Sequence, residues 1–152
     1  MKKIRVYADT SVFGGIFDEE FEKHSIIFFE QIKNNQFDLV TSAVVQAETQ
    51  KAPQKVEDFF IEMLGYAEII DITDEAIRLR NAYLDSHIVL PKHSNDALHV
   101  ALATISNCDV VVSWNFKHIV HFEKIPLYNA VNILQGFHQI TIYSPMEVIQ
   151  YE

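Results

Sequence analysis

The sequence feature that most constrains the fold is a short, almost wholly apolar run at residues 109–113, with the sequence DVVVS. Three consecutive β-branched valines leave no polar face, which is typical of a strand buried on both sides. Such strands belong to parallel sheets, because the helices that connect parallel strands cover both faces of the sheet. The run therefore predicts an α/β fold.

The rest of the chain alternates strand-like and helix-like patterns, as such a fold requires. Four more strands are predicted, at residues 3–8, 37–41, 68–72 and 139–143. Ser42, Thr73 and Ser94 are expected to cap three of the intervening helices. Helices are predicted at residues 21–34, 42–51, 53–64, 74–86, 95–106 and 126–135, and a capping box at 144–147 begins a last short helix. The alternation predicts a three-layer α/β/α sandwich with a mostly parallel central sheet.

Length and composition indicate one globular domain that spans residues 1–152. Hydrophobic residues make up 49% of the chain and charged residues 22%, which excludes a disordered chain. A single cysteine, Cys108, excludes an internal disulfide and a thiolate zinc cage, and therefore fits the reducing cytoplasm. No apolar run approaches the ~18 residues of a membrane span, and the N-terminus lacks the apolar stretch of a signal peptide. We therefore expect a cytoplasmic protein without membrane association.

The chain is acidic, with 12 Lys and Arg residues against 21 Asp and Glu residues and a formal net charge of −9. Such a charge argues against a broad electrostatic contact with nucleic acid, whose phosphates attract Lys and Arg. If this protein binds RNA or DNA, we expect a local contact at which metal ions supply positive charge.

Four oxygen-bearing side chains are predicted to meet at one edge of the sheet. Asp9 directly follows the first strand, and Asn115 follows the valine run by two residues. Glu48 lies about two turns into the helix after the second strand, and Asp96 lies in the first turn of a later helix. In open parallel sheets the functional crevice forms at the carboxyl ends of the strands, where all four residues are expected.

Two other acidic residues, Asp38 and Asp109, begin their strands and are expected at the opposite edge of the sheet.

Carboxylates gathered in one crevice repel one another unless a cation compensates their charge. Mg²⁺ prefers oxygen ligands and is often held by one or two carboxylates. Such an ion activates water and neutralises charge on a phosphodiester. From the spacing alone, solvated carboxylates and dipole partners at helix starts remain the alternative.

Four motifs of the sequence together resemble those of PIN-domain ribonucleases. Residues 6–11 (VYADTS) resemble the first strand of the family with its Asp, and residues 44–48 (VVQAE) resemble the helix with the second acidic residue. Residues 95–103 (NDALHVALA) closely resemble the helix with the third acidic residue. Residues 109–115 (DVVVSWN) resemble the last core strand, in which Ser or Thr stands two residues before a fourth acidic residue. The resemblance covers about residues 3–120.

The resemblance implies a PIN-like fold and an endoribonuclease that depends on Mg²⁺ or Mn²⁺ and hydrolyses RNA phosphodiester bonds. It further implies a toxin of the VapC type, which pairs with an antitoxin protein and forms a homodimer. Asp9 and Asp96 would then be the central metal ligands, and Glu48 a ligand directly or through water. Asn115 stands where the family usually has Asp, so the metal site lacks one charge and weaker catalysis is expected.

Five further side chains are candidates for contact with the substrate: Thr10, Ser11, Ser113, Lys117 and His118. The hydroxyls of Thr10 and Ser11 are suited to bind phosphate or metal-coordinated water, or alternatively to cap a short helix after the first strand. Ser113 has the same two interpretations, as a site hydroxyl or as a buried group with its hydrogen bond satisfied. Lys117 and His118 would supply the local positive charge that an acidic RNA-binding protein needs, and a solvated loop is their alternative.

Other residues near these motifs have two interpretations as well. An aromatic ring of this segment is suited to stack on an RNA base, but the favoured interpretation places Trp114 or Phe116 in the core. His99 is a partner of the site or, as favoured, a core histidine with satisfied hydrogen bonds. Lys92 and His93 contact substrate or lie in a solvated loop.

Two function classes are therefore carried forward. The first is the metal-dependent endoribonuclease, with Asp9, Glu48 and Asp96 at its centre. The second is a catalytically weak or degenerate PIN-like module that acts by binding RNA or protein, because Asn115 removes a charge from the site. A phosphotransferase with Asp9 as nucleophile is disfavoured, because Ser11 stands where such enzymes have a second Asp.

Overall fold

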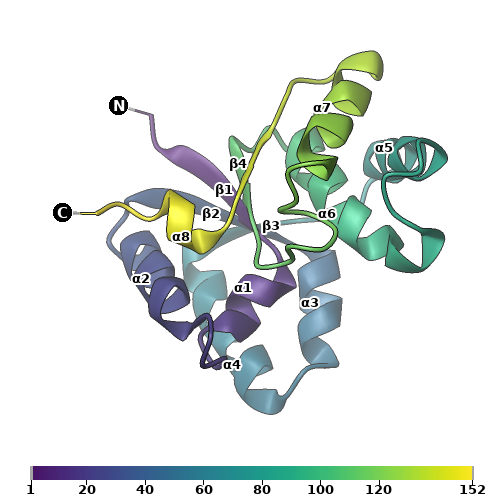
Figure 1. Cartoon of the computed structure of the whole chain (residues 1–152). Coiled ribbons are helices and arrows are strands. Elements are labelled where there is room, and N and C mark those ends of the chain that lie inside the picture. Colours follow the sequence, from purple (N-terminus) through teal and green to yellow (C-terminus); the bar gives the residue numbers. More distant parts are fainter. Residues whose placement is uncertain (1, 152) are drawn as a thin grey trace.

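The structure is a computed structural model and describes residues 2–151. Its core is one sheet of five strands, in the order β3-β2-β1-β4-β5 (Figure 1). Every strand pair in this sheet is parallel, which confirms the predicted parallel sheet. The strands are β1 Ile4–Ala8, β2 Phe37–Ser42, β3 Ala67–Ile70, β4 Val110–Val112 and β5 Thr141–Tyr143.

Helices cover both faces of the sheet, which confirms the predicted three-layer sandwich (Figure 1). The helices are α1 Thr10–Gly15, α2 Glu22–Lys33, α3 Ala43–Gln50, α4 Gln54–Met63, α5 Asp74–Asp85, α6 Ser94–Ile105, α7 Lys124–Leu134 and α8 Pro145–Val148, with 3₁₀ turns η1 Leu64–Tyr66 and η2 Pro91–His93. The chain runs from β1 through β2 to β3 and then returns to β4 and β5 on the other side of β1. With right-handed crossovers this reversal places α1–α4 on one face and α5–α7 on the other.

Side-chain caps fix several helix starts where the sequence predicts them. The Ser42 hydroxyl accepts a hydrogen bond from the backbone N–H of Val45 at 3.3 Å, and the Thr73 hydroxyl accepts one from Ala76 at 3.1 Å. The prediction for Ser94 is wrong, because this residue is the first residue of α6. The 3₁₀ turn η2 leads directly into α6 and leaves no extended residue at which Ser94 could cap.

The start of one other helix also differs from the prediction. Helix α7 begins at Lys124, two residues before Pro126. Pro126 fits there because the N–H groups of the first helical turn have no partner within the helix.

Apolar side chains fill the space between the sheet and both helical layers. The valines of β4 are buried, with Val111 and Val112 fully so, which confirms the interpretation of this run as a central strand. Rings from α1, α2, β2 and α4 pack together in one layer, namely Phe13, Phe28, Phe29, Phe37, Phe59 and Phe60. On the other face, Tyr83 and Tyr128 meet edge to face at 4.9 Å. The rigid sheet therefore fixes the backbone at its carboxyl end.

The strand order determines where a site can form. The connections after the neighbouring strands β1 and β4 lead to helices on opposite faces, and the carboxyl ends of such strands are where open parallel sheets generally bind their ligands. The backbone N–H of Asp9 donates to Val112 O at 3.2 Å, so Asp9 lies at this switch point. Asp38 and Asp109 lie at the amino ends of β2 and β4, at the opposite edge as predicted. Among residues 2–151, no helix is long and apolar enough to cross a membrane.

Candidate active site

Asp9 is a buried carboxylate at the carboxyl end of β1. Its side chain is 3% exposed, and both of its oxygens accept hydrogen bonds from hydroxyl groups. Ser11 donates to Oδ1 and Ser113 donates to Oδ2, each at 2.6 Å. Asp9 is the N-cap residue of α1, so Ser11 does not cap this helix. The two serines, which follow β1 and β4, hold the carboxylate in a fixed orientation.

Glu48 approaches this carboxylate from α3. Its Oε1 accepts a hydrogen bond from the Thr10 hydroxyl at 2.5 Å and one from His99 Nε2 at 2.8 Å. The Glu48 side chain is 32% exposed, whereas His99 is buried. Thr10 is the first residue of α1, and its hydroxyl points to Glu48 instead of capping the helix.

His99 extends the network into the core. Its Nδ1 lies 2.7 Å from the hydroxyl of Tyr7, which in turn lies 2.7 Å from the Ser42 hydroxyl. His99 is therefore a core histidine with satisfied hydrogen bonds and also a direct partner of Glu48, so the two interpretations of this residue are both correct. The chain of contacts ties Glu48 to β1 and β2 through Tyr7 and Ser42.

Asp96 lies in the first turn of α6, where the helix dipole favours a negative charge. Its side chain is 24% exposed, and its Oδ2 lies 3.9 Å from His93 Nδ1. Among residues 2–151, one group of three acidic or histidine side chains has ligand atoms all within 4.8 Å of one another, and it consists of His93, Asp96 and His118. Asp9, Glu48 and Asp96 do not form such a group among these residues.

Asn115 is held by its own loop. Its Oδ1 accepts hydrogen bonds from the backbone N–H groups of Lys117 at 3.2 Å and His118 at 2.9 Å. Its own backbone N–H donates to the Ser113 hydroxyl at 2.8 Å. The side chain that was predicted to be a ligand thus stabilises the turn after β4, and its oxygen is already engaged.

The loop after β4 separates its aromatic residues. Trp114 is buried, stacks on Phe21 with ring centroids 4.3 Å apart, and donates from Nε1 to the Ser25 hydroxyl at 2.8 Å. Burial of Trp114 confirms the favoured interpretation that one of the two rings lies in the core, and Phe116 is 46% exposed. Lys117 is exposed, and the half-buried ring of His118 stacks on His93 with centroids 4.0 Å apart.

Burial and hydrogen bonding shift the acid–base behaviour of Asp9, Glu48 and His99 in different directions. Burial raises the pKa of Asp9, although the charge of His99 and the bonds from both serines oppose this rise. Burial alone would raise the pKa of Glu48, but the hydrogen bond and charge of His99 outweigh it and lower this pKa. Burial alone would lower the pKa of His99, but the bond to Glu48 and the nearby negative charges raise it. Glu48 and His99 therefore stabilise each other as an ion pair, whereas ionisation of the buried Asp9 carboxyl lowers the stability of the folded protein.

Comparison with known families identifies the family of this fold. The family model of the PIN domain matches residues 6–118, which include Asp9, Glu48, Asp96 and Asn115. The chain belongs to the PIN domain family. Among curated proteins, none is significantly similar in sequence to this PIN domain.

Solved structures with the same fold cover nearly the whole chain. VapBC2 from Rickettsia felis, bound to a DNA fragment from its promoter, is 17% identical, covers 93% of this chain and 98% of its own, and has a TM-score of 0.61. FitAcB from Neisseria gonorrhoeae is 12% identical, covers 94% and 99%, and has a TM-score of 0.60. FitAB bound to an IR36 DNA fragment is 11% identical, covers 97% and 99%, and has a TM-score of 0.62. At these identities the likeness concerns the fold of the PIN domain.

The residues of this PIN domain fit a hard divalent cation such as Mg²⁺. Asp9, Glu48 and Asp96 offer only oxygen atoms, the ligands that Mg²⁺ prefers. A nearby cation would also offset the cost of burying the Asp9 charge, which its raised pKa reflects. The donor set is thus suited to the metal that PIN domains usually bind.

Sequence reasoning missed two residues of the PIN domain site. From its pattern, Tyr7 is only an apolar strand residue, yet its hydroxyl joins Ser42 and His99. The structural role of Asn115 was also missed, although Asn with a free N–H two or three residues later is a known turn pattern.

Proposed function

We propose that this PIN domain is a metal-dependent endoribonuclease that hydrolyses RNA phosphodiester bonds. The observation that carries the proposal is the buried Asp9 carboxylate at the strand switch point, oriented by two serines and accompanied by Glu48 and Asp96. A buried carboxylate whose ionisation is costly is typical of functional sites. Membership of the PIN family supports a nuclease over a phosphotransferase.

Asp9, Glu48 and Asp96 would hold Mg²⁺ or Mn²⁺, and Asn115 is the fourth predicted ligand. The chemistry supplied by the bound cation is activation of water and neutralisation of the charge that develops on the phosphodiester. Asn115 would bind the cation only through an oxygen that already accepts two backbone hydrogen bonds. Weak catalysis with one metal ion is therefore part of the proposal.

Neighbouring side chains orient the carboxylates and shift the pKa values of Asp9 and Glu48 in opposite directions. His99 donates to Glu48 and keeps it ionised, while Thr10 fixes the rotamer of the same carboxylate. Ser11 and Ser113 orient Asp9 through their hydrogen bonds, and Ser11, Ser113 and Thr10 remain proposed substrate-binding residues. Lys117 and His118 are the proposed contacts to the RNA backbone.

We further propose that the protein acts in the cytoplasm as the toxin of a toxin–antitoxin pair and forms a homodimer. The three similar solved structures described above are of VapBC2, FitAcB and FitAB, as their descriptions state. An antitoxin segment with Arg or Lys would complement the acidic crevice. Co-expression with a neighbouring small gene, followed by light scattering, tests both the complex and the dimer.

The test of the proposed function is Mn²⁺ binding by calorimetry together with RNA cleavage, on the wild type and on Asp96→Asn. We expect the wild type to bind Mn²⁺ and cleave RNA, and Asp96→Asn to lose both while its circular dichroism is unchanged. The matched control is Asp38→Asn, which removes the same charge from the far edge of the sheet, where Asp38 pairs with Lys3 at 3.3 Å. Retained cleavage in Asp96→Asn, or an equal loss in Asp38→Asn, would refute the proposed site.

The weak or degenerate module makes a different prediction for the same proteins. It requires a wild type that binds Mn²⁺, RNA or a partner without cleaving RNA. A wild type that is folded, binds Mn²⁺ and leaves RNA intact at high protein concentration would favour it over the enzyme.

A further inference from the structure

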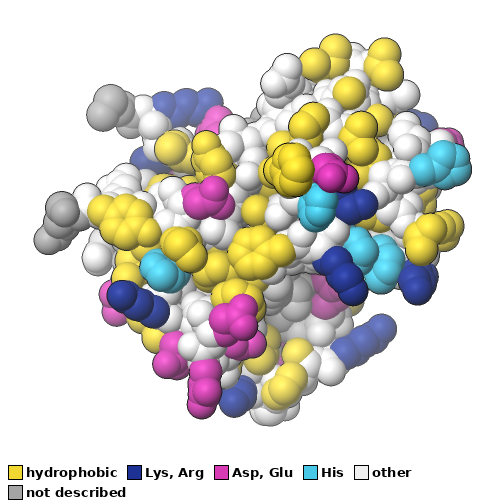
Figure 2. Space-filling model, viewed as in Figure 1, with side chains coloured by type: hydrophobic (Ala, Val, Ile, Leu, Met, Phe, Trp, Pro, Cys, Tyr) yellow, Lys and Arg dark blue, Asp and Glu magenta, His cyan; other side chains and the backbone are white. Residues whose placement is uncertain are grey.

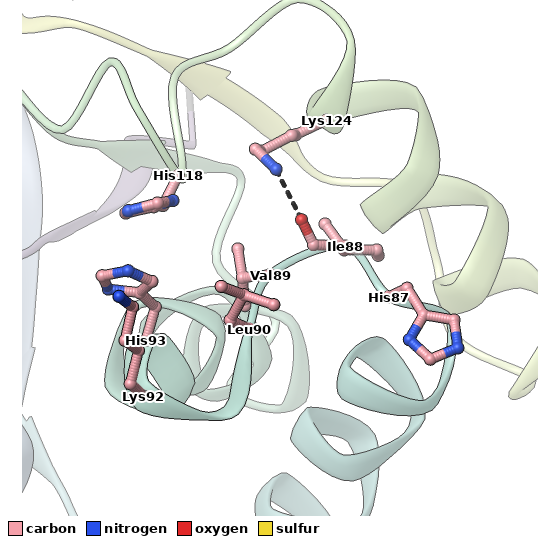
Figure 3. A pocket seen from close by; sticks show the side chains of 8 residues that line it. All are labelled: His87, Ile88, Val89, Leu90, Lys92, His93, His118 and Lys124. Carbon is pink, nitrogen blue, oxygen red and sulfur yellow. Dashed lines mark hydrogen bonds between the residues drawn. The ribbon is translucent and has the colours of Figure 1, made fainter.

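We call the group formed by Asp9, Glu48 and Asp96 the carboxylate crevice. A pocket lined largely by basic side chains lies next to it, on the side of Asp96. Its volume is about 340 Å³, and Figure 3 shows the side chains that line it. The lining comes from the segment between α5 and η2, from η2 itself, from the loop after β4 and from the start of α7. We call it the basic pocket, and its residues are His87, Ile88, Val89, Leu90, Lys92, His93, His118 and Lys124.

The charge of this pocket contrasts with the charge of the protein. Two lysines and three histidines line it, and none of its lining residues is acidic. The chain as a whole has 12 Lys and Arg residues against 21 Asp and Glu residues. Figure 2 shows several His side chains with Lys or Arg side chains among them on the right of the visible face, other Lys and Arg side chains at the left and bottom, and most Asp and Glu side chains at the lower left. The pocket is thus a local site where an acidic protein can attract an anion.

Lys124 is positioned by the pocket wall. Its ammonium donates a hydrogen bond to Ile88 O at 2.5 Å, drawn as a dashed line in Figure 3. An ammonium group has three donors, so this bond orients the charge while two donors are left for a ligand. Lys124 also opens α7, so the positive end of this helix dipole adds to the charge of the side chain.

The two stacked histidines carry hydrogen-bonding capacity that the protein uses only in part. Figure 3 shows the ring of His118 lying over that of His93. The Nδ1 atom of His118 is buried without a hydrogen-bond partner among residues 2–151. His93 Nδ1 stays 3.9 Å from Asp96, which is too far for a hydrogen bond. Buried polar groups without partners are rare and commonly mark a functional site.

The same histidines and Asp96 also meet the spacing of a metal site, with ligand atoms within 4.8 Å of one another. The lysines decide between the two ligands. Lys92 and Lys124 line the pocket beside the histidines and would repel a cation, whereas an anion gains from both charges. The neighbouring site is proposed to hydrolyse RNA phosphodiester bonds, so phosphate is the anion expected in this pocket.

We propose that the basic pocket binds a phosphate group of the RNA strand, next to the phosphodiester that is cleaved. This inference rests on the proposed nuclease function, whose site it extends through Asp96 and His93. Lys92, Lys124 and the histidine pair bind the phosphate oxygens, and the apolar wall formed by Val89 and Leu90 faces the attached ribose. The pocket thereby supplies the positive charge that the crevice lacks and fixes the register of the strand.

The test combines NMR with a double variant. Inorganic phosphate is titrated into ¹⁵N-labelled wild type at constant pH and low salt, and we expect the amide shifts of residues 87–93 and 118–124 to move.

In Lys92→Gln/Lys124→Gln, phosphate should bind about tenfold more weakly and the KM for single-stranded RNA should rise by about as much, with kcat retained. The Lys124→Gln change keeps an N–H donor for the Ile88 carbonyl, and thermal unfolding checks the fold. The control is Lys33→Gln/Lys55→Gln, which removes the same charge from α2 and α4.

Each outcome bears on the pocket separately from the nuclease. If phosphate moves the pocket amides and the double variant raises the KM, the proposal is supported. If wild type cleaves RNA but neither effect is seen, the pocket is overturned and the nuclease stands. If phosphate binds but the KM is unchanged, the pocket serves free phosphate and the RNA contact is refuted. If Mn²⁺ or Zn²⁺ moves these amides and phosphate does not, His93, Asp96 and His118 form a cation site instead. If wild type does not cleave RNA, the double variant's affinity for intact RNA replaces the KM and decides the pocket alone.

Discussion

The carboxylate crevice and the basic pocket share Asp96 as a neighbour but are built in opposite ways. In the crevice the oxygens of Asp9 and the Oε1 of Glu48 already accept hydrogen bonds from side chains at 2.5–2.8 Å. In the basic pocket His93 stands 3.9 Å from its acidic neighbour, and a nitrogen of His118 has no partner within residues 2–151. The side chains of the crevice are already joined in a hydrogen-bonded network, whereas the pocket has hydrogen-bonding groups without a protein partner in the described part of the chain.

This difference suggests a division of labour. Preorganised groups stabilise a transition state because they need no rearrangement during the reaction. Hydrogen-bond donors that no protein group occupies favour binding of an extended anion whose position varies. If this division is correct, changes in the crevice lower kcat and changes in the pocket raise KM.

The largest effect is expected for Asp9→Asn, which removes the central charge of the crevice. RNA cleavage should fall about 100-fold or more, since a lost metal ligand costs several kcal/mol of transition-state stabilisation. Stability should not fall. Burial raises the pKa of Asp9 above its unfolded value, so its ionisation destabilises the fold above the unfolded pKa, and a neutral amide relieves this cost at pH 7.

Cleavage assays and thermal unfolding at pH 7 measure both halves of this prediction. Ser113→Ala serves as the comparison, because it keeps the Asp9 charge and removes one of its hydrogen bonds. An Asp9→Asn protein that cleaves RNA as fast as the wild type would remove Asp9 from the proposed site.

The second prediction concerns Gly15, the last residue of α1, which lies against Trp114 and Ser25. A Cβ at position 15 would lie 2.5 Å from Ser25 Oγ and 2.8 Å from Trp114 Nε1, which are hydrogen-bonded to each other. Trp114 also donates from its backbone to Ser11, a partner of Asp9. Gly15→Ala should therefore cost about 2 kcal/mol of unfolding free energy and disturb the crevice.

Gly14→Ala is the matched control for this overpacking. A Cβ at position 14 meets nothing within 4 Å, so the helix should gain about 0.5–1 kcal/mol. Urea unfolding compares the two variants with the wild type. Equal stabilities for both would show that the contact of Gly15 with Trp114 is not tight. Phosphate binding in the basic pocket should be unchanged in either variant.

The third prediction addresses the missing charge at Asn115. Asn115→Asp keeps an oxygen for the N–H groups of Lys117 and His118, so the turn after β4 should persist. The added charge should tighten Mn²⁺ binding about tenfold, which is about 1.4 kcal/mol. Calorimetry measures the affinity, and Asn115→Ala, which loses the capping oxygen, should be less stable by about 1 kcal/mol. Unchanged affinity in Asn115→Asp would mean that this side chain does not face the cation.

The sequence predicts well those features that depend on neighbouring residues. The parallel sheet follows from the apolar runs, and Asp9 is placed by the strand that ends directly before it. The caps at Ser42 and Thr73 are local as well. Ser94 shows the limit of such reasoning, because the 3₁₀ turn before it leaves no extended residue for a cap.

Contacts between distant segments account for what the sequence did not predict. Tyr7 meets His99 across 92 positions of the chain, and nothing in the pattern of β1 marks its hydroxyl as a partner of α6. Lys124 reaches Ile88 across 36 positions, so the basic pocket appears only when α7 packs beside the segment after α5. Lys92 and His93 remained ambiguous from sequence because their neighbours were unknown.

The smallest effect is expected at Cys108, which lies at the amino end of β4, away from both the crevice and the pocket. Burial raises the pKa of its thiol to about 12, above its ordinary value of 9.0. The thiolate is the reactive form, so a thiol reagent at pH 8 should label the native protein slowly and the urea-unfolded protein quickly. Stability from the protonated thiol is fully present below pH 9 and is lost as the pH rises toward 12, and Cys108→Ala should abolish only this part of the alkaline loss. Fast labelling of the native protein would indicate that β4 opens at its amino end, and the rigidity of the strand that carries Ser113 and Asn115 would then have to be reconsidered.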